Sequence, residues 1–378
     1  MKNKNSHSQT PTRPDFHTPP PPPHPSGVRL PAEWEPQDGV LICWPHEKTD
    51  WAPYLQEAEE VFLHIAEAIT RFEKLIVVVP DEKTVREKLE AHGVRMDRVF
   101  LYEIESNDTW ARDFGPIPIY ENGQPVLLDF TFTGWGGKFE AGLDNQITAK
   151  LHAAGAFSNT PRRTIDLILE GGSIESDGKG TLLTTSECLL NPNRNAQFDK
   201  KKIEEKLSTE LGIKKTLWVE NGGLVGDDTD AHIDTLARLC PDNTILYVQC
   251  TDPTDEHFPA FHALENQLRR FAEKFQGLEK TKWRLLPLPW PQAKFDKDGN
   301  RLPATYANYL IINDAVLIPT YNDPSDFQAL ETIGKAFPDR EVIGIDGSTL
   351  ILQHGSLHCV TQQIPKGVLP REFIKLQT

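Results

Sequence analysis

The sequence predicts an α/β protein, and three observations support that fold class. Short apolar runs rich in β-branched residues alternate with helical patterns from Leu30 onward. Several runs end in a polar or glycine-rich turn that leads into a further apolar run, as in the segments that begin at Leu101, Ile165, Thr216 and Val342. These units recur along the whole chain, which is typical of a pseudo-symmetric single domain whose turns face one site. An open, doubly wound sheet also gathers its site at strand ends, so the pattern leaves both arrangements open.

Apolar periodicity predicts the individual elements. Short apolar runs bounded by turn residues predict strands at 40–44, 75–79, 99–104, 126–132, 164–169, 180–184, 216–219, 245–249, 309–312, 315–319, 341–345 and 350–353. Apolar residues that repeat every three to four positions predict helices at 53–72, 82–91, 199–211, 255–275 and 325–337. No long linker interrupts these elements, which favours one domain over residues 29–378.

Composition and charge exclude several classes of function. The 378 residues include 40 Lys and Arg against 55 Asp and Glu, a formal net charge of −15. Nucleic-acid binding needs clustered Lys and Arg, so this acidic chain favours a small cationic substrate instead. No apolar run approaches the ~20 residues of a membrane span, and the N-terminal segment lacks the apolar stretch of a signal peptide.

The five cysteines are an odd number, widely spaced and without a CxxC pair. This pattern argues against a disulfide framework and against a structural zinc site. We therefore expect free thiols and a reducing, cytoplasmic location.

Residues 1–28 differ in composition from the rest of the chain. Residues 1–27 hold eight prolines and almost nothing apolar. This composition predicts a disordered or polyproline II tail, which is either passive or a docking motif.

One short segment between two predicted strands contains Asp108, Trp110, Arg112 and Asp113. Two carboxylates match the N–H groups of a guanidinium by paired, charge-assisted hydrogen bonds. An indole adds a cation–π face, so the segment can build a pocket for a cation. It equally suits an Asx-turn with an Arg112 salt bridge, and the segment alone leaves both interpretations open.

Two further segments carry acidic residues at strand ends. Glu170 follows an apolar run and precedes two glycines, so its carboxylate can reach into a cleft; an ordinary turn is the alternative. Residues 226–234 hold four aspartates and one histidine, His232. Crowded carboxylates favour the imidazolium form of a neighbouring histidine, which suits a general acid. The spacing is not that of an EF-hand calcium loop, while a solvated acidic turn remains open.

Cys359 is the candidate nucleophile. His354 and His358 lie close to it in the sequence, and neighbouring imidazoles can lower the pKa of a thiol. In an extended segment His358 and Cys359 would point to opposite faces, which makes His232 the better acid/base candidate. A buried cysteine without a role is one alternative. A zinc site built from these three residues and His232 is another, although Gly355 and the β-rich surroundings disfavour the helix that it would need.

Together the motifs resemble those of a known family. The segments 107–116, 169–173, 227–234 and 355–365 resemble those of the agmatine deiminases, which belong with the bacterial peptidyl-arginine deiminases to the guanidine-modifying (pentein) superfamily. Shorter matching pieces lie at 31–36, 43–45, 191–195 and 321–323, and the resemblance runs in order from about residue 29 to the C-terminus. Ala231 stands where glycine is frequent, and His-Gly-Ser-Leu-His precedes Cys359 in place of Gly-Gly-Asn-Ile-His of some relatives; neither departure removes a catalytic group.

The resemblance implies a five-bladed, pseudo-symmetric α/β propeller, the pentein fold, with neither a metal nor an organic cofactor. It implies that Cys359 is the nucleophile and His232 the general acid/base. It places the guanidinium-binding carboxylates at Asp113 and Asp234, and Glu170 where a carboxylate hydrogen-bonds the substrate or the histidine. The substrate-binding residues predicted with them are Trp110 in the pocket wall, Asp108, and Asp228 for the far end of the substrate.

The reaction implied by the resemblance is hydrolytic deimination of agmatine to N-carbamoylputrescine and ammonia, in polyamine metabolism. Cys359 would attack the guanidinium carbon to give a covalent thiouronium, and His232 would protonate the departing ammonia and then activate water. A peptidyl-arginine or arginine deiminase is the nearest alternative; a non-enzymatic guanidinium or polyamine binder and a zinc hydrolase are alternatives of other classes. The expected partners are a small cationic guanidinium substrate and further copies of the chain in a homodimer or larger homo-oligomer, with no nucleic acid and no membrane.

Overall fold

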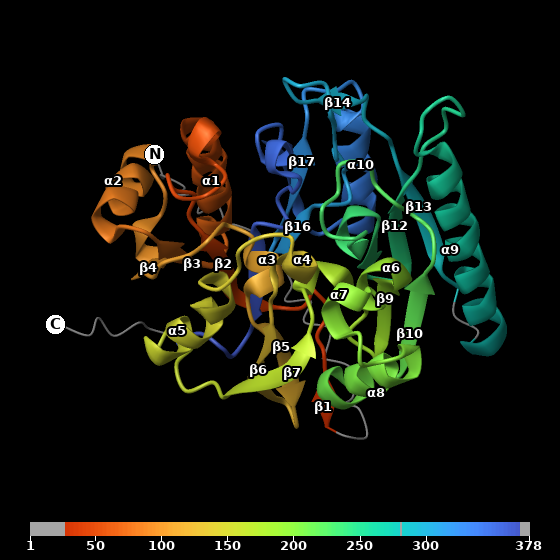
Figure 1. The fold of residues 1–378 in the computed structure, drawn as a ribbon, viewed down its shortest axis with the longest axis horizontal. Helices are drawn as coiled ribbons and strands as arrows, with labels where there is room; N and C mark the ends of the chain where they lie inside the picture. Colours follow the sequence, from red (N-terminus) through yellow and green to blue (C-terminus); the bar gives the residue numbers. More distant parts are fainter. Residues whose placement is uncertain (1–26, 280–281, 371–378) are drawn as a thin grey trace, which may run out of the picture.

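The computed structural model describes residues 27–279 and 282–370, and these residues form an α/β fold. The predicted N-terminal tail lies, except for its last two residues, outside the described part of the chain. In Figure 1 the sheets surround the middle of the molecule, and the longer helices lie on the outside. The α/β class predicted from the sequence is therefore confirmed.

The strands are short and number nineteen in the described ranges. Their bounds are β1 (Val28–Arg29), β2 (Gln37–Cys43), β3 (Lys74–Val79), β4 (Val99–Glu103), β5 (Ile117–Glu121), β6 (Gln124–Thr131), β7 (Arg162–Ile168), β8 (Ile174–Ser176), β9 (Thr181–Thr185), β10 (Lys215–Val219), β11 (Ala237–Cys240), β12 (Thr244–Val248), β13 (Arg284–Leu288), β14 (Lys294–Phe295), β15 (Arg301–Leu302), β16 (Leu310–Ile312), β17 (Ala315–Thr320), β18 (Glu341–Asp346) and β19 (Thr361–Pro365).

These strands form several small sheets with a common plan. The orders are β1-β5-β6-β7, β10-β9-β8, β11-β12-β13, β16-β17-β18, β19-β2-β3-β4 and the two-stranded β14-β15. Apart from β14-β15, each sheet joins an antiparallel pair to a parallel pair, as β5-β6 and β6-β7 illustrate. The pairing of β19 with β2 brings the last described strand beside a strand near the start of the domain.

Helices connect the strands. The α-helices are α1 (Leu55–Thr70), α2 (Glu82–His92), α3 (Ala111–Phe114), α4 (Gly134–Gly137), α5 (Ile147–Ala153), α6 (Ser186–Leu189), α7 (Pro192–Asn195), α8 (Lys200–Leu211), α9 (Phe258–Glu279) and α10 (Asp326–Ala336). The 3₁₀ turns are η1 (Ala52–Tyr54), η2 (Met96–Arg98), η3 (Asp144–Gln146), η4 (Gly171–Ser173), η5 (Ile233–Thr235) and η6 (Leu350–Gln353).

Local sequence explains the main elements. The run Lys74–Val79 is apolar and β-branched, and β3 is buried on both faces between β2 and β4. In α1 the residues Phe62, Ile65 and Ile69 recur at helical spacing and are all buried. Asp81 caps α2, because its side chain accepts a hydrogen bond from the Thr84 backbone N–H at 2.6 Å.

The predicted strand at 350–353 is wrong, because these residues form the 3₁₀ turn η6. The Ile351 N–H donates to the Gly347 carbonyl at 3.2 Å, which closes a helical turn. A short apolar run does not distinguish the two conformations by its periodicity.

The polar turns singled out in the sequence lie at the ends of β4, β7, β10 and β18, and these four turns carry the candidate site. Across residues 27–279 and 282–370, no helix combines the length and apolar character that crossing a membrane requires.

Candidate active site

Cys359 lies in the turn between η6 and β19 and is buried. Asn308 Nδ2 donates to Cys359 Sγ at 3.1 Å, and Asp234 Oδ2 lies 3.8 Å from the same sulfur. Burial raises the pKa of the Cys359 thiol well above its ordinary value, and the carboxylates of Asp234 and Asp113 raise it further. In the free protein Cys359 is therefore a protonated thiol, and a cation bound beside it would favour the thiolate.

His232 precedes η5 and is fully buried. Among the described residues neither ring nitrogen has a hydrogen-bond partner; Nδ1 lies 3.6 Å from Asp113 Oδ1, and Nε2 lies 4.0 Å from Glu170 Oε2. Burial lowers the pKa of His232 to about 3, although the carboxylate of Asp234 opposes the shift. The prediction that the neighbouring aspartates favour an imidazolium is wrong for the free protein, because loss of hydration outweighs their attraction.

The two predicted guanidinium-binding carboxylates have different partners. Asp113, in α3, accepts hydrogen bonds at 2.9 Å from Trp135 Nε1 and from the Gly172 backbone N–H. Burial raises the pKa of Asp113 well above its ordinary value, and the neighbouring carboxylates add to the shift. Asp234 accepts a hydrogen bond from His358 Nδ1 at 2.7 Å through Oδ2, while its Oδ1 has no partner among the described residues. Burial alone would raise the pKa of Asp234, but the hydrogen bond and charge of His358, together with the charges of His232 and Arg238, lower it below its ordinary value.

Gly172 shows how closely the site residues approach one another. A Cβ at this position would lie 2.6 Å from His232 Nδ1, 2.9 Å from Asp113 Oδ1 and 3.0 Å from Asp234 Oδ2. Any side chain here would displace the three groups, so glycine is required. The structure thus brings together, from three separate turns, residues that the sequence analysis predicted to act together.

Glu170 lies at the end of β7 and is fully buried. Arg194 Nε donates to both Glu170 oxygens at 2.9 Å, and Arg194 also pairs with Asp230 at 2.7 Å. Burial raises the pKa of Glu170, although Arg194 opposes the shift. Lys138 pairs with Asp230 from the solvent side at 2.7 Å, so this network extends from the buried site to the surface.

Trp110 is buried beside the segment that leads to Cys359. Its ring packs between Trp51 and Trp135, with centroid distances of 5.8 and 6.3 Å. A Cβ on Gly355 would lie 2.1 Å from the Trp110 ring, so glycine lets the segment before Cys359 pass against the indole.

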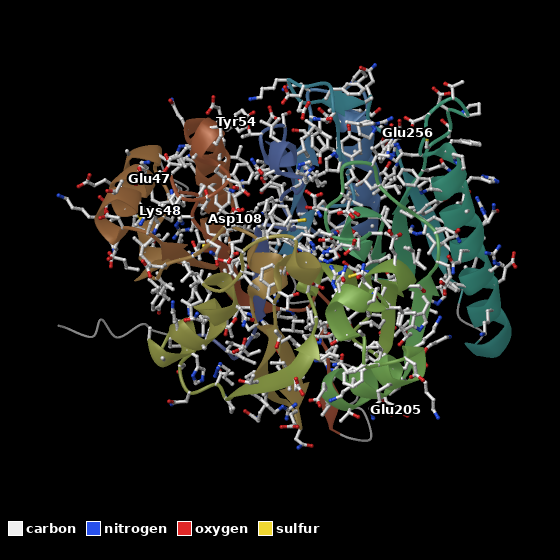
Figure 2. The ribbon with its side chains drawn as sticks, in the orientation of Figure 1. Glu47, Lys48, Tyr54, Asp108, Glu205 and Glu256 are labelled. Atoms are coloured by element: carbon white, nitrogen blue, oxygen red, sulfur yellow. The ribbon has the colours of Figure 1, made fainter. Side chains whose placement is uncertain are left out.

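Among the described residues, the hydrogen-bond and ion-pair partners of Asp108 and Asp228 do not include Cys359, His232, Asp113 or Asp234. Asp108 accepts from the Thr109 N–H at 2.8 Å, and burial raises its pKa to about 7. It belongs to the loop before α3, on the side of the molecule that carries α1 (Figure 2). Asp228 is half-buried, with its side chain 43% exposed, and its carboxylate lies 3.7 Å from His354 Nε2. The structure therefore places Asp228 on the surface, outside the cluster around Gly172.

His358 and Cys359 do not lie in an extended strand. They belong to a turn, and both contact Asp234 Oδ2, so the opposite-face arrangement considered for an extended segment does not apply. The acidic segment 226–234 does not form an empty calcium loop either: Asp227 accepts three hydrogen bonds from Thr229 and Ala231.

Three groups of side chains are close enough to share a metal ion, within the ranges that the structure covers. They are Glu170, Cys188 and His232; Glu33, Glu175 and His358; and His64, Glu67 and His92. Cys359 is in none of them, so the geometry does not favour the zinc site that joins Cys359 to the three histidines. Glu170 is already paired with Arg194, as Glu33 is with Arg112 and Arg238.

The sequence analysis gave no role to several residues of the site. Trp135 binds Asp113 from an unusual left-handed backbone (φ 55°), Arg194 binds Glu170, and Asn308 holds the Cys359 thiol. Arg194 lies within the matching piece 191–195, which was the available signal for it. Trp135 and Asn308 lie outside every segment singled out in the sequence, and only the fold brings them to the site.

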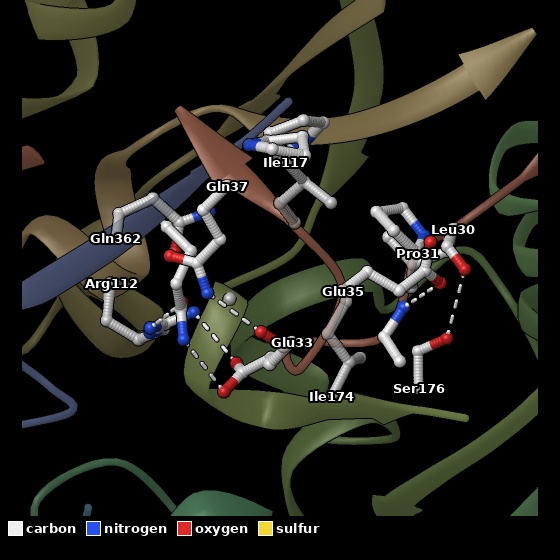
Figure 3. Close-up of a pocket in the computed structure, with 15 residues that line it drawn as sticks. Leu30, Pro31, Glu33, Glu35, Gln37, Arg112, Ile117, Ile174, Ser176 and Gln362 are labelled. Atoms are coloured by element: carbon white, nitrogen blue, oxygen red, sulfur yellow. Dashed lines mark hydrogen bonds and ion pairs between the residues drawn. The ribbon is translucent and has the colours of Figure 1, made fainter. Parts of the chain in front are cut away.

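A cavity of about 70 Å³ lies beside this centre and not within it. Its lining includes Glu33 and Arg112, which pair at 3.0 Å (Figure 3), but not Cys359 or His232. Its volume is sufficient for several waters, which suits the polar groups that face it.

The fold and the centre define an α/β protein with a buried cysteine, a histidine and three carboxylates around one point. Residues 29–365 match the Porphyromonas-type peptidyl-arginine deiminases, and the chain belongs to that family.

Named relatives support this membership. The agmatine deiminase of Pseudomonas fluorescens is 34% identical over 368 residues, covering 91% of this chain and 97% of the relative. The structure of a cysteine-to-serine agmatine deiminase of C. jejuni with substrate bound is 38% identical, with a TM-score of 0.83 and coverage of 90% and 97%. A candidate arginine deiminase of Porphyromonas gingivalis is 47% identical, with a TM-score of 0.84 and coverage of 91% and 100%.

Proposed function

We propose that this protein hydrolyses agmatine to N-carbamoylputrescine and ammonia, with Cys359 as the nucleophile. The observation that carries the proposal is the convergence of Cys359, His232, Asp113 and Asp234 on one buried point. Asp234 Oδ1, which has no partner in residues 27–279 and 282–370, and the crowded carboxylates favour a cationic group with N–H donors, which a guanidinium supplies. The relatives named agmatine deiminase support agmatine as the substrate.

Binding of the guanidinium prepares the nucleophile. Asp113 and Asp234 accept its N–H groups and hold its plane between Cys359 and His232. Its positive charge offsets the carboxylates that raise the pKa of the Cys359 thiol. The substrate itself therefore favours the thiolate that attacks it.

The covalent step moves one proton. The thiol proton passes to His232 as the C–S bond forms, which gives a neutral tetrahedral intermediate on the former guanidinium carbon. His232 then gives that proton to one amino group, the C–N bond breaks, and ammonia leaves. A positively charged thiouronium remains on Cys359, so charge and protons balance.

Hydrolysis restores the enzyme. Neutral His232 takes a proton from a water that attacks the thiouronium carbon, and Glu170, 4.0 Å from Nε2, stabilises the imidazolium that results. The C–S bond breaks and the ureido product leaves. One proton of the water returns to the Cys359 thiol and the other is released.

The repeated sheet plan supports a finer description of the fold. We propose that the sheets with a mixed antiparallel and parallel pairing are the blades of a five-bladed pentein propeller, formed by residues 29–378 as one catalytic domain. We also propose that Trp110, Asp108 and Asp228 bind the substrate, with Trp110 in the pocket wall and Asp228 at the far end of the substrate. We propose in addition a cytoplasmic location, which the cysteine pattern favours, and a homo-oligomer, which the family resemblance implies.

The test is an assay for ureido product with agmatine, free arginine and a blocked arginine peptide in parallel. We expect product from agmatine, reduced by at least about 10⁴-fold in Cys359→Ala and unchanged in Cys250→Ala, whose thiol contacts the Asp252 carbonyl. Product from an arginine compound alone would keep the chemistry and overturn the substrate. Binding of agmatine without product from any compound would support a guanidinium binder instead.

A further inference from the structure

A buried network continues from Asp234 into the molecule through His358, Arg238 and Glu33. We propose that His358 is a positioning residue, whose Nδ1–H holds the Asp234 carboxylate so that Oδ1 is left for the substrate guanidinium. This inference rests on the proposed function and adds to it a residue that does not touch the substrate.

The first step concerns the hydrogen on His358 Nδ1. This nitrogen lies 2.7 Å from Asp234 Oδ2, and both residues are fully buried. A bare nitrogen would direct its lone pair at a carboxylate oxygen, and two acceptors repel at that distance. His358 Nδ1 therefore carries a hydrogen and donates it.

The second step is that the other ring nitrogen, His358 Nε2, has a hydrogen-bond partner whether the imidazole is neutral or protonated. Arg238 lies 3.0 Å from His358 Nε2, and Glu33 Oε1 lies 2.9 Å from it. A neutral ring accepts from Arg238 at Nε2, and a protonated ring donates to Glu33. In both states Nδ1 keeps its hydrogen, so Asp234 does not lose its donor when the ring titrates.

The third step is that the two supporting groups are themselves fixed. Arg238 donates to the Ala307 and Tyr309 carbonyls at 3.0 and 2.7 Å, and it pairs with Glu175 and Glu33. Glu33 accepts in addition from Arg112 and Gln363, at 3.0 Å each; Figure 3 shows the pairing with Arg112. Glu33 belongs to the matching piece 31–36, for which the mechanism has no other use.

The consequence is a carboxylate with one oxygen engaged and one free. Asp234 Oδ2 is held by His358, while Oδ1 has no partner in the described part of the chain. The titratable and charged groups that face Asp234 are His358 and Cys359 before β19, His232 before η5, Asp113 and Arg112 in α3, Arg238 in β11, and Asp227. Of these, His358 makes the hydrogen bond that contributes most to lowering the pKa of Asp234 against burial.

The test compares three substitutions of His358. An asparagine amide nitrogen is as many bonds from Cα as Nδ1 is, whereas the amide nitrogen of glutamine corresponds to Nε2. In His358→Ala and His358→Gln we expect kcat/KM for agmatine to fall about 100-fold and its acid limb to move to higher pH, because Asp234 loses its donor. His358→Asn should stay within about ten-fold of wild type and keep the acid limb in place. An equal loss in all three with an unmoved acid limb would reduce His358 to a structural role.

Two measurements test the role of His358 independently of whether agmatine is the substrate. Alkylation of Cys359 by 2-chloroacetamidine, in which a C–S bond replaces the C–Cl bond and chloride leaves with the thiol proton, needs no turnover of agmatine. Its rate relative to neutral iodoacetamide should fall about ten-fold in His358→Ala and not in His358→Asn, even if agmatine is not the substrate. If the variants do not fold, nitrogen NMR of histidine-labelled wild type still decides: a bare Nδ1 on His358 would overturn the proposal.

Discussion

Two buried arginines, Arg238 and Arg194, flank the reacting residues. The carboxylates on the two sides, Asp234 and Glu170, differ in the direction of their pKa shifts. On one side Arg238 supports His358, which donates to Asp234; burial would raise the pKa of Asp234, but this hydrogen bond and the neighbouring cationic groups together lower it. On the other side Arg194 pairs with Glu170 at 2.9 Å, yet burial keeps the pKa of Glu170 raised. The difference indicates that the Asp234 carboxylate stays negatively charged, whereas the Glu170 carboxylate can take up a proton.

The two networks also end in different places. The network of Arg238 ends inside the protein, on backbone carbonyls and buried carboxylates. The network of Arg194 continues through Asp230 to Lys138, whose side chain is 36% exposed. We therefore expect the loss of Arg238 to reduce mainly the stability and the loss of Arg194 to reduce mainly the activity.

The largest effect should come from Arg238→Met. Methionine of similar length leaves Glu33 and Glu175 buried beside each other without their shared cation. Breaking a buried ion pair in this way costs about 3–5 kcal/mol of unfolding free energy. Urea unfolding measures it, with Arg269→Met on the surface of α9 as the matched control. A loss as small as that of the control would refute the assignment of this network to the fold.

Arg194→Met should reduce activity more than stability. Glu170 then loses both hydrogen bonds from Arg194 and takes up a proton, because burial already raises its pKa. Without the negative charge near His232 Nε2, we expect kcat/KM for agmatine to fall about 100-fold. The comparison fails if Arg194→Met unfolds as easily as Arg238→Met and has unimpaired turnover.

A third prediction concerns the proton held by Asp113. Burial and neighbouring carboxylates raise the pKa of Asp113, so it is protonated in the free site up to a higher pH than an ordinary aspartate. Binding a guanidinium favours the charged form, so agmatine should displace up to about one proton at neutral pH and none above the raised pKa. Calorimetry of Cys359→Ala in buffers of different ionisation enthalpy measures the release. Adding Asp113→Asn should abolish it; release that persists would have another source.

The sequence pointed to the residues of the candidate site more completely than to the residues that hold them in place. Predicted helices such as 82–91 and 199–211 correspond to α2 and α8, because their apolar spacing and capping residues are local signals. Gly172 and Asp234 lie in compact motifs, and the resemblance of these motifs to the family gave Asp234 its predicted role. Asn308 and Trp135 were missed because only the pairing of distant segments brings them to the centre. The neutral state of His232 follows from burial, which residue spacing does not reveal.

Ala231→Gly should stabilise the segment before His232. Ala231 adopts φ 61°, in the left-handed region that disfavours a side chain. Relief of this strain should raise the unfolding free energy by about 1 kcal/mol at most, since glycine also gains entropy in the unfolded chain. Urea unfolding provides the value, and Ala260→Gly within α9 should show the opposite sign. A destabilised Ala231→Gly variant would mean that the backbone there is not strained.

The smallest effect should come from Lys138→Met, at the exposed end of the Arg194 network. Burial would raise the pKa of Asp230, but hydrogen bonds from Lys138 and Arg194 outweigh it and lower the pKa. A half-exposed ion pair contributes about 0.5 kcal/mol, so we expect about a two-fold change in kcat/KM and a similarly small loss of stability. The loss should be present above about pH 4 and vanish as the pH falls through the lowered pKa of Asp230, since a protonated carboxyl no longer pairs with Lys138. Because Arg194 still holds Glu170, a loss as large as that of Arg194→Met would show that the surface lysine controls the centre directly.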